Sequence, residues 1–158
     1  MQKISPCLWF KDNAEEAAHF YTNLFKDSRI VSDMRFGDAG PGPKGALMAV
    51  TFELEGQEFM ALNGGTVFTF SPAISLFIKC GTQEEVDRLW AALGEGGEPR
   101  QCGWISDKYG VTWQVVPNEL FTLLANKDPA KAQRVTESML TMQKLDVNVL
   151  KQAAEQAD

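Results

Sequence analysis

The pattern of apolar and polar positions along the chain repeats once, at an offset of about seventy residues. A short apolar run that starts at a serine spans residues 5–10, and a second such run spans residues 75–80. Each run is followed by a stretch with apolar residues at i, i+3, i+4 and i+7, which predicts an amphipathic helix. The chain is therefore predicted to contain one strand and helix unit in two copies.

Both predicted helices begin with a capping signature. Asn13 is followed three residues later by Glu16, and Thr82 is followed in the same way by Glu85. The apolar positions of the first helix are Ala14, Ala17, Ala18, Tyr21, Leu24 and Phe25, and those of the second are Val86, Leu89, Trp90 and Leu93. The glycines that follow position 93 predict the end of the second helix.

Strand-like stretches follow each helix. In the first copy they span residues 29–36, 46–54 and 58–63, with a tight turn at residues 55–57 and a Gly-Pro-rich loop at residues 37–45. In the second copy they span residues 99–106 and 111–116, joined by a turn at residues 107–110. The two copies therefore predict the same order of a strand, a helix and further strands.

Residues after Pro117 have no counterpart in the first copy. Residues 119–126 predict a short helix, and Asp128 with Pro129 predicts the start of a longer helix that ends near Met142. A third helix is predicted from about Asp146. The apolar stripes of the last two helices comprise Ala132, Val135, Met139 and Met142, then Val147, Leu150, Ala154 and Ala157. These stripes are expected to pack on a sheet or on a second subunit.

Composition and charge narrow the class of protein. A chain of 158 residues that is 44% hydrophobic can form one domain, expected over residues 1–158. The net charge of −6, without a basic stripe, argues against nucleic acid and anionic membranes as partners. No signal peptide or membrane-length apolar run is visible, which predicts a cytoplasmic protein. The three cysteines are expected to be reduced thiols.

The combined motifs resemble the vicinal-oxygen-chelate superfamily, which includes glyoxalases, bleomycin-resistance proteins and extradiol dioxygenases. They include FYTNLF at the end of the first helix and D-x-x-G-V-x-W-Q near residue 110. LNGG, AISLFIKC, CGWISDKYGVTWQVVP and DPAKAQRV are similar to the PhnB-like branch, whose domain label is 3-demethylubiquinone-9 3-methyltransferase.

This resemblance implies an α+β fold of two βαβββ modules whose strands form a curled mixed sheet around an open cup. The modules are expected at about residues 1–65 and 72–117, with a helical tail at residues 118–158. The resemblance also implies a homodimer.

The resemblance places a metal site in some members, formed by a histidine on the first strand and a carboxylate on the last strand of each module. The corresponding positions here are expected to be Ser5, Ser75, Ala61 and Gln114, none of which is a usual ligand for such an ion. The single histidine, His19, is expected on the surface of the first helix. No metal and no cofactor are therefore predicted.

The methyltransferase label receives no support from the residues. Binding of S-adenosylmethionine normally uses a glycine-rich loop between a strand and a helix. The glycine-rich residues 40–45 lie between two predicted strands and contain two prolines. They predict a surface turn.

Alternation along the strands suggests the lining of the cup. The candidate ligand-binding residues are Ser5, Cys7, Trp9, Phe59, Ala61, Asn63, Ser75, Phe77, Lys79, Trp104 and Gln114. Aromatic walls with a few amides and hydroxyls suit a small, flat or partly apolar molecule. Lys79 could pair with an anionic ligand or lie in water, and Trp104 and Trp113 could belong to the core.

The sequence thus favours a protein that binds a small molecule in the cup without a metal, by sequestration or by a metal-free reaction. One alternative is an enzyme, either a metal-dependent lyase or dioxygenase with altered ligands or the methyltransferase of the label. Another is a structural or regulatory dimer without a ligand.

Overall fold

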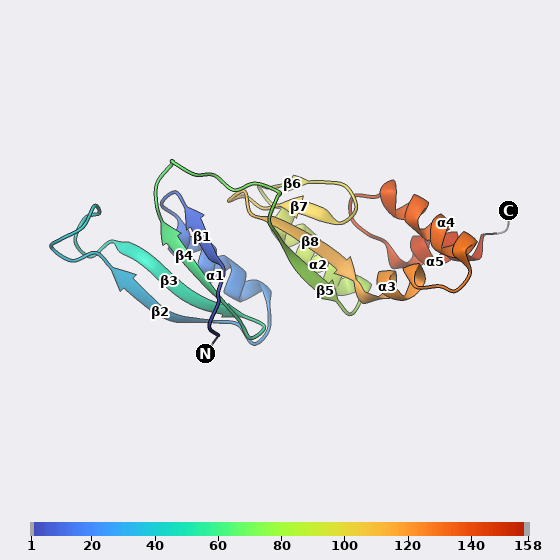
Figure 1. The fold of residues 1–158 in the computed structure, drawn as a ribbon, viewed down its shortest axis with the longest axis horizontal. Coiled ribbons are helices and arrows are strands. Elements are labelled where there is room, and N and C mark those ends of the chain that lie inside the picture. The colour runs from blue at the N-terminus through green and yellow to red at the C-terminus, as the bar shows by residue number, and fades with distance from the viewer. Residues whose placement is uncertain (1, 157–158) are drawn as a thin grey trace. The chain divides into compact units, whose positions relative to one another are not determined.

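The computed structural model describes residues 2–156, which form an α+β fold of two four-stranded mixed sheets and five helices (Figure 1). The chain divides into two compact units, residues 1–70 and residues 71–158. Each unit contains one βαβββ module, as the resemblance implies, and the three last helices belong to the second unit. None of the helices within residues 2–156 is long and apolar enough to span a bilayer.

The first module contains four strands and one helix. They are β1 (Cys7–Phe10), α1 (Ala14–Leu24), β2 (Arg29–Arg35), β3 (Leu47–Leu54) and β4 (Gln57–Asn63). The strand order is β1-β4-β3-β2, with β1 parallel to β4 and the other pairs antiparallel. These bounds agree with the predicted strands to within two residues.

Helix α1 packs its predicted apolar stripe on one face of this sheet. Tyr21 is fully buried, and its ring lies 6.3 Å from that of Phe52, which in turn stacks on Phe59 at 5.5 Å. Asn13 is the N-cap residue of α1, as predicted, but its side chain makes no capping bond. Instead the first helical N–H, that of Ala14, donates to the side chain of Asn63 on β4 at 2.9 Å.

The second module repeats this arrangement. It contains β5 (Ser75–Cys80), α2 (Gln83–Gly94), β6 (Glu98–Pro99), β7 (Trp104–Ser106) and β8 (Thr112–Pro117), in the strand order β5-β8-β7-β6. Strand β5 is parallel to β8. Here the predicted cap is confirmed, because the Thr82 hydroxyl accepts from the backbone N–H of Glu85 at 3.1 Å.

The predicted strand at residues 99–106 is wrong in one respect, because a turn interrupts it between β6 and β7. Cys102 and Gly103 both have positive φ, at 60° and 84°, which no strand residue adopts. A side chain at position 103 would meet the Val115 carbonyl oxygen and the Leu145 side chain at 3.0 Å. The turn is held by the carbonyl oxygens of Met142 and Gln143, which accept from the N–H groups of Cys102 and Gly103.

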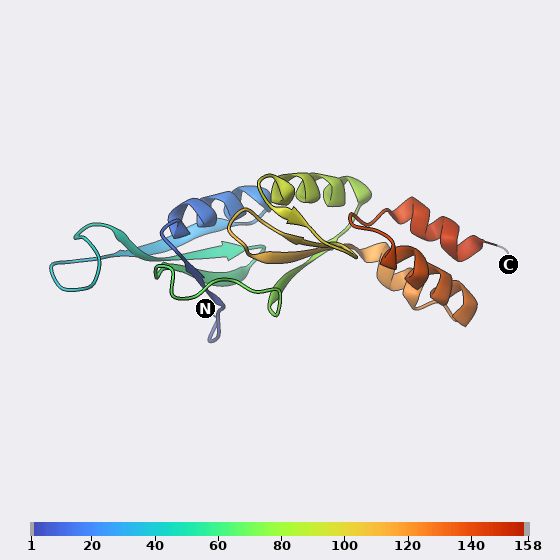
Figure 2. The ribbon, with the colours of Figure 1, turned by 90° about the horizontal axis from the view of Figure 1, so that it is seen from above.

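The three C-terminal helices are α3 (Asn118–Leu124), α4 (Pro129–Leu140) and α5 (Val147–Glu155). They gather at the end of the second sheet, beyond β8 (Figure 2). Their apolar stripes pack mainly on one another, around Val116, Leu120, Val135, Leu145, Leu150 and Ala154. The α4 helix ends two residues before the predicted Met142, and the predicted stripe residue Ala157 lies outside the described residues.

Candidate ligand-binding face of the second module

The strand register brings five of the predicted site residues together on one face of the second sheet. Phe77 on β5 lies opposite Gln114 on β8, and Gln114 lies opposite Trp104 on β7. Ser75 and Lys79 lie two residues to either side of Phe77 and therefore share its face. We call this face, which carries Ser75, Phe77, Lys79, Trp104 and Gln114, the distal face because α2 packs on the opposite one.

The opposite face is closed by α2. Cys80, Ile105 and Val115 are fully buried there, and Trp113 is 2% exposed. The indole N–H of Trp113 donates to the Asp107 carboxylate at 2.9 Å, and the same carboxylate accepts from the backbone N–H of Val111 at 3.1 Å. The D-x-x-G-V-x-W motif is thus explained by a buried turn, and Trp113 belongs to the core.

A hydrogen bond links two polar side chains at the centre of the distal face. The Gln114 amide nitrogen donates to the Ser75 hydroxyl at 2.9 Å, and both residues are half-buried. Gln114 makes no other side-chain hydrogen bond within residues 2–156. Because a carboxamide carries two donors and one carbonyl acceptor, its oxygen and one N–H remain available to a ligand.

Aromatic rings flank this pair. Phe77 is 45% exposed although it lies in the middle of a strand, and Trp104 is half-buried beside Gln114. The Phe77 ring lies 5.9 Å from the ring of Phe121, on α3, at an interplanar angle of 41°. The sequence did not mark Phe121 as a site residue, since only the packing of α3 beyond β8 places it beside β5.

In the first module, two of the predicted site residues on β4 lie on the opposite face of the sheet from the one that was predicted. Cys7 and Trp9 share a face that points away from α1, as expected, and Leu8 and Phe10 are buried on the α1 side. However, Ala61 lies opposite Leu8, and Phe59 stacks on Phe52 in the core. Ala61 and Phe59 therefore face α1 and not the side that carries Cys7 and Trp9.

The equivalent of Gln114 in the first module is Met60. The pair Cys7 and Met60 in β1 and β4 corresponds to the pair Phe77 and Gln114 in β5 and β8. Asn63 is committed elsewhere, because its oxygen accepts from Ala14 and its nitrogen donates to the Leu47 carbonyl at 3.3 Å.

Ser5 has a partner that the sequence did not indicate. Its hydroxyl donates to the Glu58 carboxylate at 2.7 Å. Glu58 lies two residues before Met60 on β4 and therefore shares its face. No local sequence pattern pairs these two residues. The parallel register of β1 with β4 brings them side by side.

Trp9 is held by the LNGG motif. Its indole N–H donates to the Gly65 carbonyl at 3.0 Å, and its ring lies against Gly64, where a Cβ would overlap it. Its ring also meets that of Phe68 edge-on at 5.0 Å. The two glycines therefore allow the chain to pass over Trp9, which leaves less of this indole available for a ligand.

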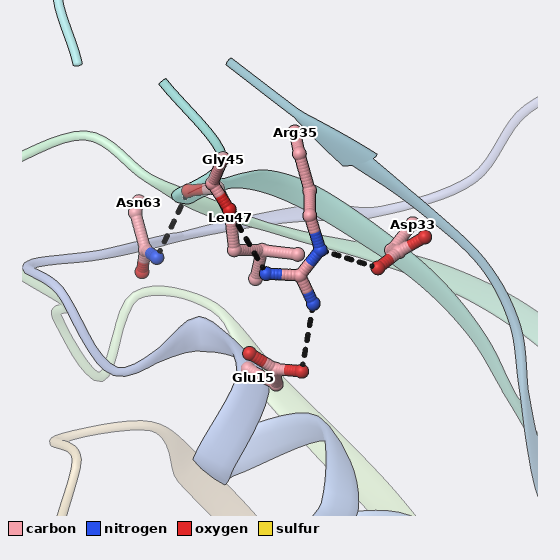
Figure 3. A network of polar contacts seen from close by, with 6 residues as sticks. All are labelled: Glu15, Asp33, Arg35, Gly45, Leu47 and Asn63. Carbon is pink, nitrogen blue, oxygen red and sulfur yellow. Dashed lines mark hydrogen bonds and ion pairs between the residues drawn. The ribbon is translucent and has the colours of Figure 1, made fainter. Parts of the chain in front are cut away.

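A second polar feature lies at the N-terminus of α1 (Figure 3). The Arg35 guanidinium pairs with Glu15 on α1 at 3.1 Å and with Asp33 at 2.9 Å, and it donates to the Gly45 carbonyl. Next to it lies an open pocket of about 740 Å³, lined by Asp12, Asn13, Glu15, Glu16, His19, Phe36, Pro43, Ala46, Leu47 and Asn63. The network ties the loop at residues 37–45 to α1 and was not visible in the sequence.

The residues at the family's metal positions do not fit a divalent ion. Ser75 and Gln114 bond to each other, the Ser5 hydroxyl donates to Glu58, and Ala61 is buried on the α1 side. Met60, the register equivalent of Gln114 in the first module, offers only a thioether. Within residues 2–156, no three histidine, cysteine, aspartate or glutamate side chains are grouped so that they could hold a metal.

Comparisons with known proteins agree with the resemblance seen in the sequence. The model of the 3-demethylubiquinone-9 3-methyltransferase family matches residues 2–116. A solved structure of the PhnB protein from Bacillus cereus is 42% identical, has a TM-score of 0.68, and matches 73% of this chain and 99% of its own. The protein PA1353 from Pseudomonas aeruginosa is 23% identical, with a TM-score of 0.63 over 74% of this chain and 98% of its own. No match was found among curated proteins. Helices α3, α4 and α5 all lie beyond the residues that the family model matches.

Proposed function

We propose, from the premise that the chain belongs to the 3-demethylubiquinone-9 3-methyltransferase domain family, that it binds a small molecule on the distal face without a metal. The ligand would be held by the amide of Gln114 and by the aromatic side chains beside it. Binding would serve either sequestration or a reaction that uses the amide to polarise a carbonyl group of the ligand.

The observation that carries this proposal is the bond between Gln114 and Ser75 beside the aromatic side chains of Phe77 and Trp104. The hydroxyl fixes the amide, so that its free oxygen and N–H have a defined direction before a ligand arrives. The exposed ring of Phe77 lies on the adjacent strand, about 5 Å away in the direction of the ladder. A few oriented polar groups among aromatic side chains are typical of small-molecule sites.

The side chains also bear on the alternative activities. A metal-dependent lyase or dioxygenase would need ligands that Ser75, Gln114 and Met60 do not supply. The methyltransferase of the family name would need a site for an adenosyl donor. Such a site usually lies at a glycine-rich turn between a strand and a helix. The turn from β5 to α2 has only one glycine, Gly81, and its helix start is already capped by the Thr82 hydroxyl. No observation favours either enzyme over a binding protein.

A homodimer is part of the proposal. It is supported by the resemblance to the vicinal-oxygen-chelate proteins and by apolar side chains that the C-terminal helices leave exposed, among them Leu140 and Val149. Such side chains on a small protein are often covered by a second subunit.

The test of binding uses benzamide, a flat molecule whose carboxamide can pair with that of Gln114. In ¹H–¹⁵N spectra, benzamide should shift the side-chain amide signals of Gln114. Gln114→Leu, whose affinity is read from the backbone N–H signals of β5 and β8, should weaken binding by on the order of 1–3 kcal/mol, because one buried polar contact of the ligand is lost. The matched control is Gln133→Leu on α4, whose amide bonds only to the exposed Glu137.

Two results would contradict the proposal. In the first, benzamide leaves the Gln114 signals in place at concentrations where it binds the protein. In the second, Gln114→Leu lowers the free energy of unfolding strongly and leaves the affinity for benzamide unchanged. Gln114 would then be a structural amide.

A further inference from the structure

We propose, resting on the function proposed above, that the ligand is a planar aromatic carboxylate, and that Phe121 of the C-terminal helices and Lys79 of β5 select it. Phe121 would supply one aromatic wall and Lys79 the charge that pairs with the carboxylate. Neither residue bonds to the Ser75 and Gln114 pair, so each adds a separate requirement to the site.

Phe121 is fixed in place by the packing of its helix. α3 begins at Asn118, directly after the last residue of β8, so no flexible linker separates them. The preceding residue, Leu120, is 5% exposed and packs with Val116 and Val135 in the core of the C-terminal helices. Phe121 is 46% exposed, although its helix is anchored in this way.

The two phenyl rings leave surface for a third ring. Phe77 and Phe121 meet at an angle of 41° with centroids 5.9 Å apart, and each leaves nearly half of its surface exposed. Aromatic rings prefer offset or edge contacts at such distances. A planar ring can therefore lie against both, whereas a saturated ring of the same size gains less.

Lys79 provides the charge complementarity. It lies two residues beyond Phe77 on the same face, about 7 Å along the strand. Its ammonium group forms no ion pair within residues 2–156. None of the distal-face residues of β5, β7 and β8 is acidic, and Glu119 of α3 is paired with Lys151 at 3.9 Å. An anionic group of the ligand would thus be the partner that this side chain lacks.

These positions define the ligand further. The hydrogen-bonding amide of Gln114 lies opposite Phe77, and Lys79 lies two residues beyond Phe77 on the same distal face of β5. A single ring that carries a carboxylate spans this distance and contacts Phe121 at its side. Because α3 lies outside the residues matched by the family model, Phe121 would distinguish this chain from relatives that share only residues 2–116.

The experiment compares three probes, benzoate, benzamide and cyclohexanecarboxylate, with affinities taken from titrations of the Gln114 side-chain signals. Wild type should bind benzoate several-fold more tightly than benzamide. Lys79→Gln should abolish this preference. Phe121→Ala should weaken both aromatic probes several-fold and cyclohexanecarboxylate less, and Phe121→Leu should do the same with packing largely kept.

Val149→Ala is the matched control, because Val149 is 43% exposed on α5 and should leave all three affinities unchanged. An unchanged ratio of benzoate to benzamide in Lys79→Gln would overturn the charge assignment. Unchanged affinities for both aromatic probes in the two Phe121 variants would overturn the assignment of Phe121 as an aromatic wall of the site. Either result, with Gln114 still responding to benzamide, would leave the function proposed above standing. If no probe shifts Gln114, both proposals fail.

Discussion

Cys7 and Cys80 hold the same functional group in different surroundings. Burial raises the pKa of the Cys7 thiol, although the residue is exposed as a whole. For Cys80, burial together with the nearby charge of Glu85 raises the pKa to about 12. Since the thiolate is the reactive form, neither residue resembles a catalytic nucleophile at neutral pH.

Alkylation with iodoacetamide tests this difference. A raised pKa means a smaller thiolate fraction at any given pH, so Cys7 should react more slowly than a free thiol near neutrality. Its rate should rise as the pH increases beyond the usual thiol range. Cys80 should react only after unfolding, because it is fully buried.

Mass spectrometry of peptides from pH series provides the rates, and denatured protein serves as the reference. Rapid modification of Cys7 at neutral pH would contradict this account of its surroundings.

Single residues also show where sequence reasoning succeeded. On β5 the two polar residues, Ser75 and Lys79, are four positions apart, so that they could be assigned to one face together with Phe77 between them. On β4 the run Phe59 to Leu62 is apolar at every position, so alternation could not tell which half faces α1. Only the pairing of Leu8 with Ala61 decides it. Phe59 and Ala61 were therefore assigned to the wrong face for want of a register.

Among the elements, the start of α5 depends on a side chain from the other end of the second unit. The Gln83 amide of α2 donates to the Leu145 carbonyl at 2.9 Å and accepts from the Val147 N–H at 2.8 Å. It thereby satisfies two backbone groups on a segment that has no strand partner. This contact fixes the C-terminal helices to the second module.

Gln83→Ala should lower the free energy of unfolding by about 1–3 kcal/mol, because both backbone groups lose their partner. Urea unfolding followed by circular dichroism measures the change. Gln133→Ala, which removes only an exposed contact with Glu137, should cost less than about 0.5 kcal/mol. Equal costs for the two variants would show that the Gln83 contacts contribute nothing beyond a surface bond.

The elements themselves were predicted well where local signals were strong. All five helices of the described residues were predicted, the capping residues Thr82 and Asp128 marked the starts of α2 and α4, and the strand bounds of the first module were close. The turn between β6 and β7 was missed because its position depends on the carbonyl oxygens of Met142 and Gln143, some forty residues later. Phe121 was missed for the same reason, since its place beside Phe77 follows from tertiary packing.

At the scale of the whole molecule, the proposed homodimer has a direct measurement. Multi-angle light scattering at micromolar concentrations should give twice the chain mass of 17.5 kDa. The expected reason is the burial of apolar side chains that one chain leaves exposed. A mass that stays at that of one chain over this concentration range would remove the homodimer from the account.

The central claim is that the distal face binds its ligand without a metal. The most direct measurement is a titration of benzamide into protein treated with excess EDTA, followed through the side-chain signals of Gln114. The account predicts the same Kd as for untreated protein, and no gain on adding one equivalent of zinc, nickel, manganese or iron. Loss of binding in EDTA, with recovery on adding one of these ions, would contradict it.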